Sequence, residues 1–236
     1  LFFLVREIGF GFVTAVCGAA VYAFLPNVWV YGGTGFGDVP SATLSFAACA
    51  LILRGRHRVR SYVLGVAVLA IVGGIRPAHV AIGIIPAIVV TWRYLQAGSW
   101  RAPVAAILLG STLVVSTYAA AAFVSGGVRS YLSATRNQGA YIEEVESFRN
   151  PGRPPLSETA TMFFLFPMDQ PGLMAGVLLL ATISLSTAID RRRWQPGYIV
   201  AVFAPFAIAV WLNLNIDDTS RYAIPYLAVQ LAADGL

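Results

Sequence analysis

Residues 31–46, Tyr31-Gly-Gly-Thr-Gly-Phe-Gly-Asp38-Val-Pro-Ser-Ala-Thr-Leu-Ser-Phe46, place one carboxylate between two apolar runs. Four glycines form a short loop that reaches Asp38, and the apolar run that follows continues to Leu53. An acid at the start of a membrane-length helix is costly unless it faces water, a partner or a ligand. We therefore expect polar groups from other parts of the chain to lie beside Asp38.

The composition is typical of a membrane protein. Of 236 residues, 58% are hydrophobic and 11% are charged, whereas about 25% are charged in an average soluble domain. Every basic residue is an arginine, and the arginines lie in short clusters between apolar segments. This pattern indicates membrane orientation and argues against a nucleic-acid-binding surface. Cys17 and Cys49 both fall in apolar runs, which favours packing over a disulfide.

The apolar runs predict an all-α, polytopic transmembrane bundle that forms a single domain over residues 1–236. Crossing a bilayer takes about 20 apolar residues, or fewer where polar ends reach the interface. Because proline disfavours helical geometry in the residue before it, we predict a hairpin break at Arg76-Pro77; one unbroken helix over 61–95 is the alternative. The eight predicted segments are 9–26, 39–53, 61–76, 78–95, 102–124, 173–189, 197–214 and 221–236.

The ends of the sequence suggest a piece of a longer membrane protein. The first residue is Leu1, and the last apolar run reaches the final residues of the chain. We therefore expect the domain to be incomplete at its N-terminus and also at its C-terminus.

The arginines predict the orientation. Crossing at each segment places ten arginines on one side and six on the other, and four of those six lie in one long loop, 125–172. Short loops decide orientation, so the side with ten is predicted to be cytoplasmic. Most acids, including Asp38 and those of the long loop, then lie outside. Within that loop, the Phe-rich stretch 161–167 is too short to span and suits a helix in the interface.

Two outer residues, Asp38 and Arg76, are candidates for a site. Asp38 could face a water-filled cavity and bind a metal, a hydroxyl or a sugar, or it could cap the helix 39–53 with Pro40 in the first turn, and both roles can hold together. The planar guanidinium of Arg76 suits a phosphate, whereas the alternative is that it reaches out to water or lipid headgroups. His79 has no partner visible in sequence, and we interpret it as structural.

The last outer turn contains the remaining candidates. Helix capping and an aromatic belt explain such a turn without a site. In the functional interpretation, Arg221 pairs with a phosphate or with Asp38 across a cavity. No Ser-His-Asp order or Cys/His metal spacing is present, so no metal ligand is assigned. The candidate residues of this turn are Asp217, Asp218, Arg221 and Tyr222.

Three motifs resemble one family. They are Asp38-Val-Pro40 opening a helix, an arginine cluster at 54–60 followed by an apolar run that ends in Gly-Gly-Ile-Arg76-Pro77, and an Arg221-Tyr-x-x-Pro225 pattern that opens a late span. Together they resemble the GT-C membrane glycosyltransferases, in the branch of protein O-mannosyltransferases and aminoarabinose transferases. The likeness runs from about Phe10 to the end of the chain.

The resemblance implies an enzyme that transfers a sugar from a polyprenyl-phosphate donor to a lipid, protein or glycan acceptor on the extracytoplasmic face. It places the main catalytic acid upstream of Leu1, so the chain alone is expected to be inactive. Asp38 matches a second acidic position that organises the site and can help to hold a divalent cation. Arg76 and Arg221 are then candidates for the donor phosphate, with Tyr222, Asp217 and Asp218 also assigned to substrate binding.

Two other functions stay open at this point: an outer-face polysaccharide polymerase or ligase, and a multi-span transporter or lipid flippase. Transporters place charged groups near the bilayer midplane, but here the apolar segments are nearly free of charge. The sequence indicates neither the sugar nor the acceptor.

Overall fold

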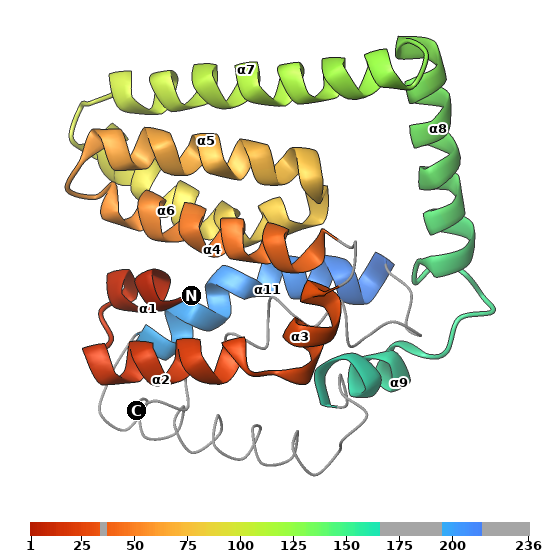
Figure 1. The fold of residues 1–236 in the computed structure, drawn as a ribbon, viewed down its shortest axis with the longest axis horizontal. Coiled ribbons are helices and arrows are strands. Elements are labelled where there is room, and N and C mark those ends of the chain that lie inside the picture. Colours follow the sequence, from red (N-terminus) through yellow and green to blue (C-terminus); the bar gives the residue numbers. More distant parts are fainter. Residues whose placement is uncertain (34–36, 166–194, 214–236) are drawn as a thin grey trace.

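The computed structural model of the chain describes residues 1–33, 37–165 and 195–213 (Figure 1). Every regular element in these ranges is helical, which confirms the all-α prediction. The predicted segments 173–189 and 221–236 lie outside the described residues.

The first 33 residues of the chain fold into short helices. Helix α1 (Phe2–Ile8) ends at Gly9, whose φ of 110° lies in the left-handed region that favours glycine. Helices α2 (Phe12–Ala23) and α3 (Pro26–Gly32) follow. The sequence predicted one span over 9–26, but α2 has 12 residues and covers about 18 Å. The glycines on its N-terminal side and Pro26 on its C-terminal side limit its length.

The central helices form a hairpin with a break where it was predicted. Helix α4 (Asp38–Arg54) is followed by α5 (Val59–Ile75), the single turn η1 (Pro77–Val80) and α6 (Ala81–Gln96). Between α5 and η1, Arg76 is extended, with φ −143° and ψ 95°. This is the geometry that Pro77 favours in the residue before it, so the unbroken helix over 61–95 is wrong.

Glycines allow these helices to approach closely. A Cβ on Gly65 of α5 would lie 2.7 Å from the Ile52 nitrogen and 2.9 Å from the Ala48 oxygen, both backbone atoms of α4. A Cβ on Gly110 of α7 (Arg101–Val124) would lie 3.3 Å from Val66 of α5. Close backbone approach through small residues is typical of helix pairs in membranes.

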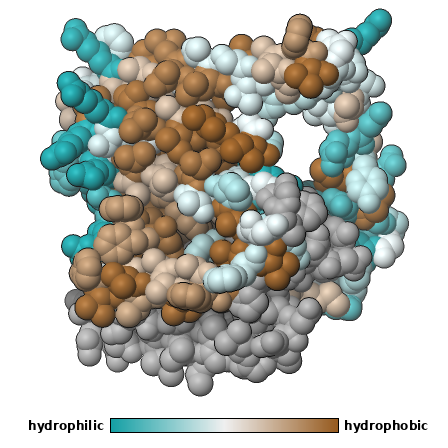
Figure 2. Space-filling view, viewed as in Figure 1, coloured by the Kyte–Doolittle hydropathy of each residue, from teal (hydrophilic) through white to brown (hydrophobic). Residues whose placement is uncertain are grey.

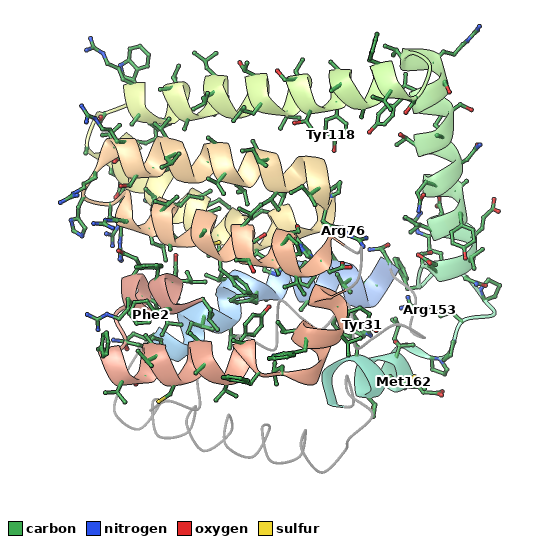
Figure 3. All side chains as sticks on the ribbon, viewed as in Figure 1. Phe2, Tyr31, Arg76, Tyr118, Arg153 and Met162 are labelled. Atoms are coloured by element: carbon green, nitrogen blue, oxygen red, sulfur yellow. The ribbon has the colours of Figure 1, made fainter. Side chains whose placement is uncertain are left out.

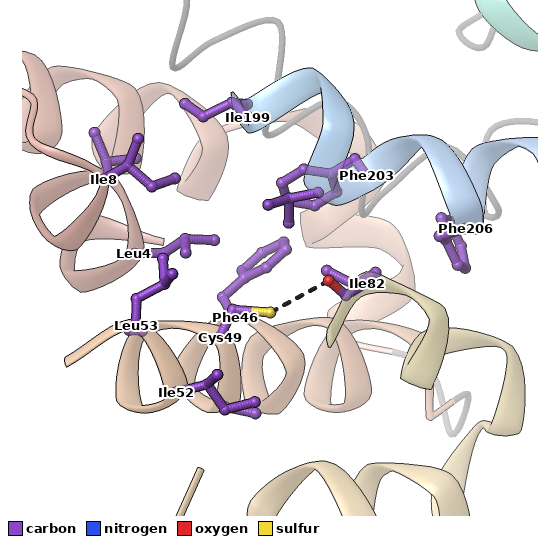
Figure 4. Packing of buried hydrophobic residues seen from close by; sticks show 14 of the residues in the cluster. Leu4, Ile8, Phe46, Cys49, Ile52, Leu53, Ile82, Ile199, Phe203 and Phe206 are labelled. Carbon is purple, nitrogen blue, oxygen red and sulfur yellow. Dashed lines mark hydrogen bonds between the residues drawn. The ribbon is translucent and has the colours of Figure 1, made fainter. Parts of the chain in front are cut away.

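Helix α11 (Gln195–Asn213) closes the core on the side of α6 (Figure 4). Its Phe203 ring packs edge-on against Phe46 of α4, with ring centroids 5.7 Å apart. In the same cluster the Cys49 thiol donates a hydrogen bond to the Ile82 carbonyl at 3.5 Å. Apolar packing therefore joins α4, α6 and α11 into one core.

The long loop 125–172 contains helices, which the sequence analysis predicted only for its Phe-rich end. In Figure 1, α8 (Val128–Tyr141) runs roughly perpendicular to α7, across its C-terminal end. The helical turns η2 (Ile142–Glu146), α9 (Leu156–Ala160) and η3 (Thr161–Leu165) follow, and η3 lies in the stretch predicted as an interface helix.

Two described segments are long and apolar enough to cross a membrane, Pro77–Gln96 and Arg101–Val124. Three further apolar helices, Phe12–Ala23, Val59–Ile75 and Gly197–Asn213, are shorter. Much of the apolar surface of α7 is exposed, including Ile107, Leu108 and Val115. A contiguous exposed apolar face marks contact with a membrane or another apolar surface (Figure 2).

Candidate functional site

Asp38 and Arg76 form an ion pair. Arg76 Nη2 donates to Asp38 Oδ2 at 2.9 Å; the Asp38 side chain is 2% exposed and that of Arg76 is 32% exposed. Asp38 is the first residue of α4, and Gly37 occupies the N-cap position. The carboxylate therefore lies in the first turn, where the helix dipole favours a negative charge, and not at the cap itself.

Gly37 brings the loop against the end of α5. A Cβ on Gly37 would lie 3.1 Å from Ile75 Cγ2, a distance at which the neighbouring side chain would have to shift by a few tenths of an ångström. Because Ile75 directly precedes Arg76, this approach places the start of α4 beside the turn that carries the arginine. The absence of a side chain at Gly37 therefore allows Asp38 to lie against the break in the hairpin.

A second polar pair lies one turn further along both elements. His79 Nδ1 and Ser41 Oγ are 2.7 Å apart, and both residues are buried. The His79 backbone N–H also donates to the Arg76 carbonyl at 3.0 Å. Asp38–Arg76 and Ser41–His79 thus form two consecutive rungs between α4 and η1.

Sequence reasoning missed the partner of His79. The signal was available as matched spacing, because residues 38 and 41 and residues 76 and 79 are each three positions apart. Residues three apart lie on the same face of a helix, so two facing pairs can form together. The interpretation of His79 as structural stays a prediction.

The Ser41–His79 pair packs against an apolar side chain of α11. The rings of His79 and Phe206 of α11 meet edge-on with centroids 5.0 Å apart. In such surroundings the attraction between opposite charges is stronger than in water, and breaking a buried pair is correspondingly costly. The Asp38 carboxylate is enclosed, whereas the guanidinium of Arg76, which is labelled in Figure 3, is part-exposed.

The site and the arginine cluster lie at opposite ends of the helices. Asp38 begins α4 and Arg76 follows α5, whereas Arg54 ends α4 and Arg60 lies in the first turn of α5. Each helix has 17 residues and is about 25 Å long. This separation agrees with the predicted division between an arginine-rich face and a face that carries the candidate site.

Residues 147–160 pack against the C-terminal end of α11. The Arg153 guanidinium donates to the carbonyls of Trp211 at 2.6 Å and Leu212 at 2.8 Å. The Trp211 indole N–H donates to Thr159 Oγ1 at 3.0 Å. A cation there complements the helix dipole. Burial lowers the pKa of Arg153 from its ordinary value, and the Glu146 carboxylate partly opposes this.

The remaining candidates lie outside the described residues. These are Asp217, Asp218, Arg221 and Tyr222. Within the described ranges, no group of three or more His, Cys, Asp or Glu side chains is placed to hold a metal ion. The suggested divalent cation and the pairing of Arg221 with Asp38 therefore stay predictions.

The chain matches no family model, no curated protein and no solved structure. The resemblance to GT-C glycosyltransferases thus depends on the three sequence motifs alone.

Proposed function

We propose that the chain belongs to a membrane glycosyltransferase that moves a sugar from a polyprenyl-phosphate donor to an acceptor on the extracytoplasmic face. The observation that carries this proposal is the pairing of an enclosed carboxylate, Asp38, with a part-exposed guanidinium, Arg76. The pair lies at the ends of α4 and α5 that are remote from the arginine cluster.

Arg76 has the chemistry to bind the donor phosphate. A guanidinium has five N–H donors in a rigid fork, and one Nη2 bond goes to Asp38. Asp38 thereby orients the fork while part of it remains exposed at the surface. In this proposal the donor phosphate binds the exposed part of the guanidinium, which the bond to Asp38 holds in a fixed orientation.

The transfer step follows from that arrangement. The acceptor oxygen attacks the anomeric carbon of the sugar, the bond from that carbon to the phosphate oxygen breaks, and the electron pair stays on the phosphate. Arg76 stabilises the charge that builds up on the phosphate. A carboxylate accepts the proton of the acceptor. In this proposal Asp38 orients Arg76, and a different carboxylate takes the proton.

The proposal includes an eight-span topology with the arginine-rich face in the cytoplasm. Support comes from the two membrane-length segments, from the exposed apolar surface of α7, and from the separation of the site from the arginine cluster. A donor with a long hydrocarbon tail reaches such a site from within the bilayer, so an enzyme for it is built from membrane spans.

The direct test is binding of undecaprenyl phosphate to the full-length protein in detergent micelles. Hydrogen bonds to charged groups contribute about 1.5–3 kcal/mol, so Arg76→Gln should weaken binding about 10- to 100-fold. Arg76→Lys keeps the positive charge but loses the planar fork of donors. Its affinity for undecaprenyl phosphate should therefore lie between those of the unaltered protein and of Arg76→Gln. Arg60→Gln, an exposed arginine at the opposite end of α5, is the matched control and should change nothing.

Sugar transfer supplies the second measurement. Asp38→Asn should sharply lower transfer from a panel of polyprenyl-phosphate sugars by the full-length protein, without lowering membrane insertion. If Arg76→Gln binds undecaprenyl phosphate as tightly as the unaltered protein, the assignment of Arg76 is wrong. Normal sugar transfer by Asp38→Asn would show that Asp38 has no role in the reaction and serves only as the first residue of α4.

A further inference from the structure

Helix α8 (Val128–Tyr141) stands apart from the packed helices. It has 14 residues and none of them is buried. A helix of this length is about 21 Å long, and isolated helices shorter than about 12–15 residues are marginal in water. The surroundings of α8 therefore matter for its stability.

The sequence of α8 has two different flanks. At 100° per residue, Val128 and Leu132 lie on one flank, while Ser130 lies on the opposite one. Arg129 and Arg136 are seven residues apart, so they lie on nearly the same line, about 10 Å apart along the axis. Residues 128–141 contain these two arginines and no acid, and the acids begin at residue 143. The helix therefore has a net positive charge and a separate apolar flank.

The apolar flank faces a cavity beside the end of α7. Val128, Tyr131 and Leu132 of α8 and Val115 and Tyr118 of α7 contribute to a cavity of about 440 Å³. The rings of Tyr118 and Tyr131 lie 6.1 Å apart between centroids. Figure 2 shows an opening in the angle between α7, α8 and the rest of the molecule.

The turn between the two helices determines their relative direction. Gly126 and Gly127 have φ values of 84° and 115°, in the region that favours glycine. They end the 24-residue apolar helix α7, and α8 then runs across its end (Figure 1). If α7 crosses the bilayer, α8 lies along the bilayer surface.

We propose that α8 binds the lipid–water interface of the bilayer that α7 crosses. In this proposal, lipid acyl chains fill the apolar cavity that Val128, Tyr131 and Leu132 line between α7 and α8. The headgroup phosphates of the same lipids contact Arg129 and Arg136. A basic helix with an apolar flank binds such a surface by combining apolar burial with attraction to anionic lipids. This inference requires α7 to span the membrane and is independent of the glycosyltransferase proposal.

The test places a fluorescent label on each flank of α8. Leu132→Cys and the matched control Ser130→Cys are made in the full-length Cys17→Ser protein, in which the buried Cys49 remains. Each is labelled with an environment-sensitive dye and reconstituted in phosphatidylcholine–phosphatidylglycerol nanodiscs. Lipid carrying a nitroxide near the top of its acyl chain should quench the label at 132 at least about threefold more than the label at 130, whereas aqueous iodide should show the opposite order.

Charge is tested separately. Arg129→Gln with Arg136→Gln should abolish the increase in lipid quenching at position 132 that phosphatidylglycerol produces over phosphatidylcholine alone. Equal exposure of both labels to iodide would show that α8 stands clear of the bilayer and would overturn the inference. Protection of both labels from iodide and nitroxide would show that protein covers α8, which also overturns it. Protection of Cys49 from a maleimide reports that each variant is folded.

Discussion

Substituting Gly65 with alanine should loosen the contact between α4 and α5. A Cβ at this position would lie 2.7 Å from the Ile52 nitrogen and 2.9 Å from the Ala48 oxygen. Both are backbone atoms, so no change of rotamer relieves the overlap, and the two helices must separate.

The size of the effect follows from two opposing contributions. Because both overlaps are with backbone atoms, the inserted methyl group should cost about 3 kcal/mol, the upper end of the usual range for overpacking. Replacing glycine by alanine inside a helix returns about 1 kcal/mol through helix propensity. The net loss of stability is therefore about 2 kcal/mol, which corresponds to about a 30-fold larger population of the open state.

Cys49 provides the assay because it is fully buried on α4, next to Ala48. In the Cys17→Ser protein, a maleimide reacts with Cys49 only when α4 separates from its neighbours. When reclosing is faster than labelling, the labelling rate follows the open population. Gly65→Ala should therefore raise the labelling rate of Cys49 about 30-fold at low maleimide concentration.

Gly139→Ala is the matched control. A Cβ at Gly139, in the exposed helix α8, would meet no atom within 4 Å. This substitution should leave the labelling rate of Cys49 unchanged. If Gly65→Ala labels no faster than Gly139→Ala, the close approach of α4 and α5 is wrong.

Two further substitutions address the segment 142–160. Arg153→Gln weakens or removes the hydrogen bonds to the Trp211 and Leu212 carbonyls. Because bonds to charged donors contribute about 1.5–3 kcal/mol, amide hydrogen exchange over residues 147–160 should accelerate about 10-fold or more. Unchanged exchange would contradict this role of Arg153. Arg149→Gln breaks the 2.6 Å ion pair with Glu143, in which both side chains are largely exposed. Thermal unfolding should therefore show a loss of stability of no more than about 1 kcal/mol. A larger loss of stability would show that the pair is part of a wider network.

The helix positions were predictable because apolar run length and proline placement determine them. The predicted runs 39–53, 61–76 and 102–124 correspond to α4, α5 and α7. The break at Pro77 was predicted from a local steric rule, which needs no knowledge of packing. Within the predicted run 9–26 the helix α2 covers only Phe12–Ala23, because hydropathy alone does not register the glycines before it and Pro26 after it.

The segment 128–160 was less predictable because its longest helix, α8, is polar. Helix α8 lacks the long apolar run that marks a span, and it was therefore included in a loop. Its position depends on the two-glycine turn at Gly126 and Gly127 and on its contact with the end of α7. The attachment of Arg153 to α11 joins residues 58 and 59 positions apart, and no local sequence pattern reports such a contact.

The two halves of the candidate site were visible in sequence, but their pairing was not. Asp38 and Arg76 were each singled out as charged residues at the ends of apolar runs. Sequence reasoning assigned Arg76 to phosphate or lipid headgroups, and the structure adds the bond to Asp38. Contacts between residues 38 positions apart depend on how α4 packs against the α5–η1 turn.

One proline links the fold to the site. Pro77 ends α5 and holds Arg76 in an extended conformation. Had the helix continued, Arg76 would lie within an apolar helix, where an arginine is costly. The break instead brings it to the end of the helix, where it pairs with Asp38, the residue that follows Gly37. The residue that makes the hairpin is therefore also the one that allows a guanidinium to face both an enclosed carboxylate and the surface.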